Sequence, residues 1–179
     1  MFGFTPKSTT RVRSLKKTWK RALRGTDIFK QGSISIFEPS ASGDIDEVNR
    51  LLALEGDLAI DPNRNDDSAF RVAVQNGHSE VVRRLLQLSG DREVDATVGD
   101  NFAIQSASRG GHVDIVRQLL GLEGDRAVDP NVQDNIAIKL ASQEGHADVV
   151  SLLLSLEGER EVDTPATDIA IQLASQNGH

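Results

Sequence analysis

Apolar and polar positions recur with a fixed period along most of the chain. A Leu-Leu pair begins at positions 51, 85, 119 and 153, and a Gly-His pair begins at positions 77, 111, 145 and 178. Successive Gly-His pairs are therefore separated by 34, 34 and 33 residues. A repeat of this length predicts units that stack and share a core, because one such unit cannot bury its own apolar face.

Each unit is predicted to hold two short helices and an extended turn. In the unit that starts at Asp67, the residues Phe70, Ala73 and Val74 have the i, i+3, i+4 spacing of one helical face. A second apolar face follows and ends at the Leu85–Leu86 pair. The same spacing recurs in the later units, so the chain is predicted to be all-α.

Cap residues mark the predicted helix ends. We expect Asp or Asn to begin each first helix and the Gly of Gly-His to end it. Each second helix should open with an acidic residue, which suits the positive helix end, and should end at another recurring glycine. The predicted N-caps are Asp67, Asn101, Asn135 and Asp168, the acidic residues are Asp46, Glu80, Asp114 and Asp148, and the second glycines are Gly56, Gly90, Gly124 and Gly158.

The period divides the chain into an N-terminal segment, residues 1–32, and a repeat region, residues 33–179. The predicted units are 33–66, 67–100, 101–134 and 135–167, with a partial unit at 168–179. The first unit departs from the pattern because Pro39 falls inside its expected first helix, where proline costs about 3 kcal/mol in an interior position. We therefore expect residues 34–42 to be irregular or to act as an N-terminal cap.

One recurring string carries a family resemblance. Residues 107–120 and 141–154 both read Ala-Ser-x-x-Gly-His-x-Asp-(Ile/Val)-Val-x-x-Leu-Leu, which resembles the ankyrin repeat. The resemblance implies a solenoid of paired antiparallel helices with short turns. A 34-residue period also suits tetratricopeptide repeats, but their Trp, Leu-Gly and Tyr pattern is absent.

The chain departs from the family pattern in two places. Where the family usually has Thr-Pro-Leu-His, one unit reads Ser68-Ala69-Phe70-Arg71, and the other units also lack the motif. The turn Gly-Asp-Arg-x-Val-Asp is longer than the family's Gly-Ala-Asp-Val-Asn. The resemblance therefore does not extend to the usual hydrogen bonds between neighbouring turns.

The resemblance also implies a binding surface. Ankyrin repeats generally bind proteins through the turn tips and the exposed side of the first helix. The matching turn positions are Arg64, Val98, Val132 and Thr167, and the matching helix positions are Arg71, Gln75, Gln105, Arg109, Lys139, Gln143, Gln172 and Gln176. An equal alternative is that these residues are merely solvent-exposed.

The composition mainly excludes classes of functional site. The chain has no Cys, which excludes disulfides, Cys-zinc sites and a thiol nucleophile. All four His residues occupy one repeat position, about 10 Å apart in a stack, so we expect them to buttress turns and not to bind a metal. No phosphate-binding loop or hydrolase motif occurs. We therefore predict no enzyme activity, no cofactor and no small-molecule substrate.

Acidic residues recur in register along the turns. We expect them to form a solvated edge, with recognition of a basic partner as the alternative, and neighbouring arginines to offset part of their repulsion. The acidic positions are Asp57, Asp91, Asp125, Glu159, Asp61, Asp95, Asp129 and Asp163, and the arginines are Arg92, Arg126 and Arg160.

The net charge of −7 hides a split along the chain. Residues 1–30 carry nine basic side chains and one acidic side chain, whereas residues 31–179 carry 11 basic and 26 acidic ones. Residues 8–24 are predicted to form one amphipathic helix that ends at Gly25, with Val12, Leu15, Trp19, Ala22 and Leu23 on its apolar face. Its basic residues are Arg11, Arg13, Lys16, Lys17, Lys20, Arg21 and Arg24.

Three interpretations of this basic segment stay open. It could dock over the first repeat as a cap, since terminal repeats need capping. It could instead bind a partner, an anionic membrane or nucleic acid, or direct import into an organelle. It could also be a disordered tail.

The C-terminus leaves a related question. Residues 168–179 supply a first helix without its second helix, so we expect either a truncated piece or a half-repeat cap. The apolar residues Ile169, Ile171, Leu173 and Ala174 could be left partly open. In that case the open end would pair with another chain, and otherwise we expect a monomer.

These features predict a non-catalytic protein–protein interaction module, acting as an adaptor or scaffold. The alternative function is a localisation factor, in which residues 1–30 bring the repeats to an anionic surface. An intracellular location, cytoplasmic or nuclear, is expected.

Overall fold

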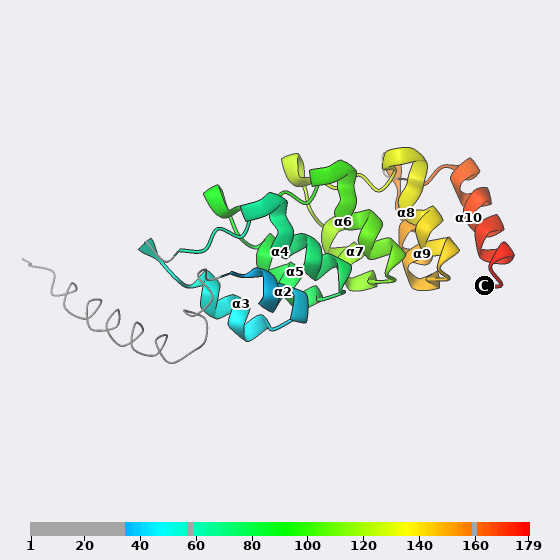
Figure 1. The fold of residues 1–179 in the computed structure, drawn as a ribbon. Helices are drawn as coiled ribbons and strands as arrows, with labels where there is room; N and C mark the ends of the chain where they lie inside the picture. The colour runs from blue at the N-terminus through cyan, green and yellow to red at the C-terminus, as the bar shows by residue number, and fades with distance from the viewer. Residues whose placement is uncertain (1–34, 57–58, 159–160) are drawn as a thin grey trace, which may run out of the picture. The chain divides into compact units, whose positions relative to one another are not determined.

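The computed structural model describes residues 35–56, 59–158 and 161–179, and Ile36–His179 form one compact unit. The described residues contain nine α-helices, two short 3-10 turns and no strand (Figure 1). The α-helices are α2 (Phe37–Ser42), α3 (Ile45–Leu52), α4 (Arg64–Gln75), α5 (Ser79–Leu86), α6 (Val98–Arg109), α7 (Val113–Leu120), α8 (Val132–Gln143), α9 (Ala147–Leu154) and α10 (Thr164–Gln176), and the 3-10 turns are η3 (Gly90–Arg92) and η4 (Gly124–Arg126). The all-α prediction is confirmed.

The helices pack in pairs that form two rows. The pairs α4–α5, α6–α7 and α8–α9 are each joined by a short Gly-His turn, and α2 and α3 are joined by Gly43-Asp44. The first helices contact one another in the order α2, α4, α6, α8 and α10, and the second helices in the order α3, α5, α7 and α9. The extended turns between pairs follow one another along one side of the stack (Figure 1). Neighbouring pairs therefore repeat one set of contacts.

Small and aliphatic side chains make the core that the two rows share. Ala73, Ala107 and Ala141 are fully buried on the first helices, where a small side chain lets neighbouring helices approach closely. Val82 and Leu85 of α5 are fully buried between the rows. The predicted core positions of the first helices are confirmed, since Phe70, Ile104 and Ile138 are at most 2% exposed.

The first helices end as the sequence predicts. Gly77 follows α4 with φ +77°, and the amide of His78 donates to the carbonyl of Ala73 at 2.9 Å. This is the glycine-terminated helix end in which a left-handed residue reverses the chain. Gly43, Gly111, Gly145 and Gly178 adopt the same conformation.

The predicted ends of the second helices are wrong by about one turn. α5 ends at Leu86, and Gly90 lies four residues later, where it opens η3 with φ +64°. Gly124 opens η4 in the same way. These glycines are needed because the chain turns through a left-handed residue there, at a position outside the helix.

The irregular structure that Pro39 led us to expect in the first unit is absent, because residues 37–42 form a helix. Pro39 is the third residue of the helix α2, which runs from Phe37 to Ser42. The first four N–H groups of a helix have no partner within the helix, so a residue without an N–H is tolerated there. Gly43 ends this helix as the equivalent glycines end the others.

The first helices begin differently from the prediction. In α6, Gly99, Asp100 and Asn101 have φ of 70°, 55° and 58°, so a left-handed turn precedes the regular helix. Residues 133–135 do the same in α8. Asn101 is the last residue of the left-handed turn. The prediction that its side chain caps the helix is wrong, because its Oδ1 atom is buried without a hydrogen-bond partner.

The start of α10 is also earlier than predicted. This helix begins at Thr164 instead of after Asp168, and the carboxylate of Asp163 caps it by accepting from the amide of Ala166 at 2.9 Å. Among the described helices, none combines the length and apolar character that crossing a bilayer requires.

Candidate functional site

The histidines of the Gly-His pairs lock each unit to the one before it. Nε2 of His146 donates a hydrogen bond to the carbonyl of Arg109, 2.8 Å away at the end of α6. The same ring covers Gly111, where a Cβ atom would lie 2.5 Å from Nδ1. Equivalent hydrogen bonds join His78 to Ala41 and His112 to Gln75. The predicted structural role of the histidines is confirmed. Among the residues described, no His, Asp or Glu cluster could hold a metal ion.

Asp61, Asp95 and Asp129 are exposed, as expected for a solvated edge, and they also fix the turns. Oδ1 of Asp129 accepts from the backbone N–H of Asn131 at 2.8 Å, and Asp61 and Asp95 make the same bond two residues along. Such short-range carboxylate bonds fix a turn. Asp91 and Asp125 are also exposed, as expected.

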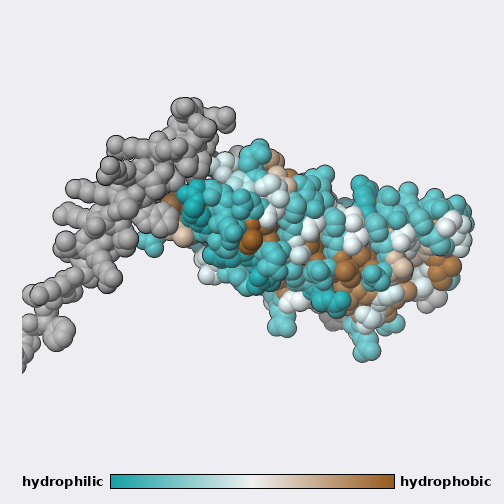
Figure 2. Space-filling view, turned by 90° about the horizontal axis from the view of Figure 1, so that it is seen from below, coloured by the Kyte–Doolittle hydropathy of each residue, from teal (hydrophilic) through white to brown (hydrophobic). Residues whose placement is uncertain are grey.

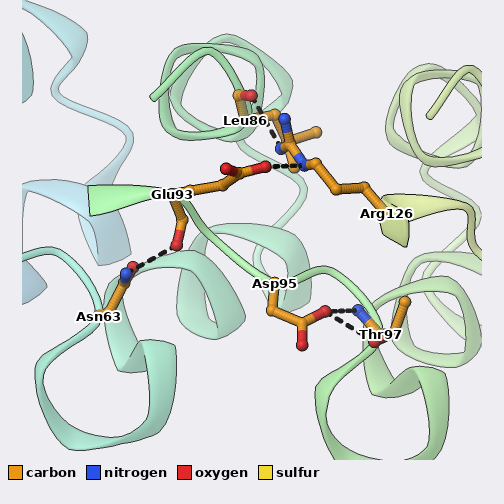
Figure 3. Close-up of polar contacts among 6 residues, drawn as sticks. All are labelled: Asn63, Leu86, Glu93, Asp95, Thr97 and Arg126. Atoms are coloured by element: carbon orange, nitrogen blue, oxygen red, sulfur yellow. Dashed lines mark hydrogen bonds and ion pairs between the residues drawn. The ribbon is translucent and has the colours of Figure 1, made fainter. Parts of the chain in front are cut away.

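Neighbouring turns are hydrogen-bonded in part. Nδ2 of Asn63 donates to the carbonyl of Glu93 at 2.7 Å in the next turn (Figure 3). Asn131 makes the equivalent bond to Glu161 at 3.2 Å. Thr97 occupies the same repeat position, but its hydroxyl donates to Asp95 in its own turn (Figure 3). The network between turns therefore persists despite the altered turn sequence, wherever Asn is present.

The turn arginines reach across to the preceding unit. Nη2 of Arg126 donates to the carbonyl of Leu86 at 2.9 Å, and its Nε forms an ion pair with Glu93 at 3.1 Å (Figure 3). Arg92 likewise donates to the carbonyl of Leu52 at 3.1 Å. Both carbonyls belong to the last residue of a second helix, where a positive charge is favourable. These arginines therefore bind neighbouring units to each other. The sequence had predicted only that they offset part of the repulsion between acidic residues of the turns.

Three of the predicted surface residues on the first helices are already engaged within the molecule. The guanidinium of Arg71 lies 4.3 Å from the ring centroid of Phe102 in the next unit. Nζ of Lys139 pairs with Asp134 at 2.5 Å, and its side chain is only 16% exposed. Gln105 donates to a backbone carbonyl of its own unit at 2.6 Å. These contacts reduce what the three side chains can offer a partner.

A second set of the predicted surface residues is exposed. Gln75, Arg109, Gln143 and Gln176 are the last residues of α4, α6, α8 and α10. Within the described part of the chain, these four side chains are exposed and make no hydrogen bond or ion pair. Because the first helices contact one another in order, the four positions succeed one another along one edge of the stack. We call this set the polar row.

The remaining predicted positions are less prominent. Val98, Val132 and Thr167 are half-buried at the starts of the first helices, and the hydroxyl of Thr167 donates to the carbonyl of Asp163 at 3.1 Å. Gln172 is exposed on α10. The side chain of Arg64, Arg160 and the seven basic residues predicted for the N-terminal helix lie outside the described residues.

A comparison with family models decides what these stacked pairs are. A model of ankyrin repeats, in three copies, matches residues 36–134, more than half of the chain. The chain belongs to the ankyrin-repeat family. The ankyrin architecture continues beyond the matched residues, through α8, α9 and α10. No curated protein and no solved structure matched the chain.

Two features of this ankyrin-repeat protein escaped sequence reasoning. The left-handed turns at residues 99–101 and 133–135 had a local signal, since Gly, Asp and Asn tolerate positive φ better than other residues. The second is an apolar groove between α9 and α10. Of the α10 residues that the sequence left partly open, only Ile171 and Ala174 line it, and α9 and the turn at Gly145 and His146 supply further lining that no local pattern indicated.

An ion pair on α3 joins Glu47 and Arg50. The carboxylate of Glu47, hydrogen-bonded to Arg50 one turn away on α3, raises the pKa of Arg50. This pair lies on a second helix, whereas the polar row lies on the first helices.

Proposed function

We propose that the chain is a non-catalytic adaptor that binds a partner protein through the polar row. The family supports this at a coarse level, because ankyrin repeats are generally protein–protein interaction modules. The finer proposal rests on a contrast between two sets of residues on the first helices. Arg71, Gln105 and Lys139 are engaged in internal contacts. The polar row is exposed and its side chains have unused hydrogen-bonding groups.

The chemistry of the polar row favours a polar peptide surface as the ligand. Gln75, Gln143 and Gln176 each offer two N–H donors and a carbonyl acceptor, and Arg109 offers a planar set of donors suited to a carboxylate. The packed helices fix the backbone beneath the row, so binding a partner orders only the side chains. A partner strand or helix with amides and at least one carboxylate fits this row.

The test is an affinity capture with quantified recovery. A variant with all four residues of the polar row changed to Ala should lose specific partners that the natural chain retains. The matched control changes exposed residues of the second helices, Arg83, Arg117 and Ser151, to Ala. Equal recovery of partners by both variants would contradict the proposal, and circular dichroism should show that both keep the helical fold.

A further inference from the structure

The turn between α4 and α5 contains an asparagine that is followed directly by glycine. Asn76 is the C-cap of α4, and Gly77 follows it with φ +77°. In the next two units the position of Asn76 is held by Gly110 and Glu144. In an Asn-Gly pair the backbone nitrogen reaches the asparagine side chain most readily, because glycine has no Cβ atom to hinder the approach. The pair at 76–77 is therefore a candidate site of spontaneous deamidation.

The reaction would join the backbone nitrogen of Gly77 to Cγ of Asn76. The Cγ–Nδ2 bond breaks, and the side-chain nitrogen leaves as ammonia with the proton of the Gly77 amide. Water then opens the cyclic succinimide at one of its two carbonyl carbons, which gives aspartate or isoaspartate. One water is consumed and one ammonia is released. The products carry a new negative charge at neutral pH, and in isoaspartate the main chain gains a CH₂ group.

Water, the second reactant, reaches this turn. The Gly-His turns lie on the lower side of the stack in Figure 1, and the view from that side shows a mostly hydrophilic surface (Figure 2). Asn76 itself is exposed.

In the folded chain the side chain of Asn76 joins two units. Nδ2 of Asn76 donates to the carbonyl of Ala41 at 2.8 Å, and Nε2 of His78 donates to the same carbonyl at 2.9 Å. Ala41 lies in the last turn of α2, where the carbonyls have no partner within the helix. The two bonds therefore couple α2 to the turn after α4. One of them depends on Nδ2, the atom that deamidation removes.

The fold also holds the reacting groups in place. The amide of Gly77 donates to the carbonyl of Val74 at 3.2 Å, and a Cβ atom on Gly77 would lie 2.6 Å from Cε1 of His112. Reaction at Asn76 therefore requires local opening of the turn. α2 is the shortest of the described α-helices, with six residues, and a helix of this length has little stability of its own. Its release from α4 frees the side chain of Asn76.

Either product opposes the return of α2 to its place. An aspartate at position 76 presents an acceptor oxygen to the carbonyl of Ala41, where the asparagine presents a donor. Its negative charge also lies at the C-terminal ends of α2 and α4, where negative charge is unfavourable. Isoaspartate lengthens the main chain immediately before the left-handed Gly77. We propose that Asn76 deamidates spontaneously and that this modification irreversibly uncouples the pair α2–α3 from the rest of the stack.

Peptide mapping by mass spectrometry follows the reaction in the full chain during incubation at mildly alkaline pH. Aspartate and isoaspartate should accumulate at position 76 about tenfold faster, or more, than at Asn101 or Asn131. Those two asparagines are followed by Phe and Val, whose side chains hinder the attack. The peptide with Asn177 is quantified separately, because Asn177 also precedes a glycine. Unfolding the chain in urea should accelerate the reaction at Asn76, since the folded turn restrains the reacting groups.

Hydrogen–deuterium exchange measures the consequence. In Asn76→Asp, and in the natural chain after incubation, amides of α2 and α3 should exchange about tenfold faster, whereas those of α8 and α9 should not change. The matched control is Gln87→Glu, the same amide-to-acid change at the exposed C-cap of α5. Among the described residues the side chain of Gln87 has no bond to lose, so exchange in α2 and α3 should stay unaltered.

A third variant links the two measurements. Asn76→Gln should show no rise in exchange with incubation time, because the longer side chain forms a cyclic imide far more slowly.

Three results would overturn the proposal. One is a rate of deamidation at Asn76 no higher than the rates at Asn101 and Asn131. Another is accumulation of the products without faster exchange in α2 and α3. The third is an equal rise in exchange in Asn76→Asp and Gln87→Glu, which would assign the effect to added charge and not to the lost bond.

Discussion

The His ring of one unit packs against the Gly of the Gly-His turn in the unit before it, as His146 does against Gly111. This contact predicts a measurable coupling between units. Gly111 has φ +69°, and the ring of His146 lies where a Cβ atom would be, 2.5 Å from Nδ1. Gly111→Ala should therefore destabilise the fold in two ways. The left-handed conformation costs about 1–2 kcal/mol for a residue with a Cβ atom. Displacing the ring also breaks the hydrogen bond to the carbonyl of Arg109, worth about 0.5–1.5 kcal/mol.

The chain supplies a control for the conformational part. Gly124 has φ +63°, and a Cβ atom there would meet nothing within 4 Å. Gly124→Ala should cost only the left-handed strain, about 1–2 kcal/mol. Gly111→Ala should cost about 1 kcal/mol more, and its combination with His146→Ala should be less destabilising than the sum of the two single changes.

Urea unfolding followed by circular dichroism at 222 nm measures these differences, provided that the slopes of the transitions agree. The four proteins of the Gly111 and His146 cycle isolate the coupling free energy. Equal costs for Gly111→Ala and Gly124→Ala, or strictly additive changes in the cycle, would refute the idea that the ring interlocks the units.

Further predictions concern the turns and the final pair. Thr97→Asn should add the missing bond to the carbonyl of Ala127 and raise the free energy of unfolding by about 0.5–1.5 kcal/mol in the same urea assay; an unchanged midpoint would count against that bond. Gln133→Gly should raise it by about 1 kcal/mol, because Gln133 has φ +50°, and a loss of stability would contradict the left-handed turn. Leu153→Ala should cost about 2–5 kcal/mol because Leu153 is 1% exposed, whereas Leu154→Ala should change the thermal midpoint little. Similar effects at the two neighbouring leucines would argue against the orientation of α9.

Periodicity alone predicted the all-α stack and most of its core. Apolar spacing identified Phe70 and Leu85 as buried, and the Gly-His pairs marked the ends of the first helices. These inferences succeed because a repeated pattern reports the same burial several times. The polar row was predicted only as part of a larger set, since sequence does not say which exposed positions turn inward to pair, as Lys139 does with Asp134.

The sequence by itself determined the helix pairs, the family and the split of charge between the two parts of the chain. Tertiary structure decided how the units hold one another: the His rings over glycines, Asn63 bound to the next turn, and Arg126 bound to the preceding helix. It also decided which neighbouring leucine is buried, since Leu153 is 1% exposed and Leu154 is 45% exposed. The physical reason is that helix formation depends on neighbours within one turn, whereas these contacts join residues about 30 to 40 positions apart, and only the stacked geometry brings them within hydrogen-bonding distance.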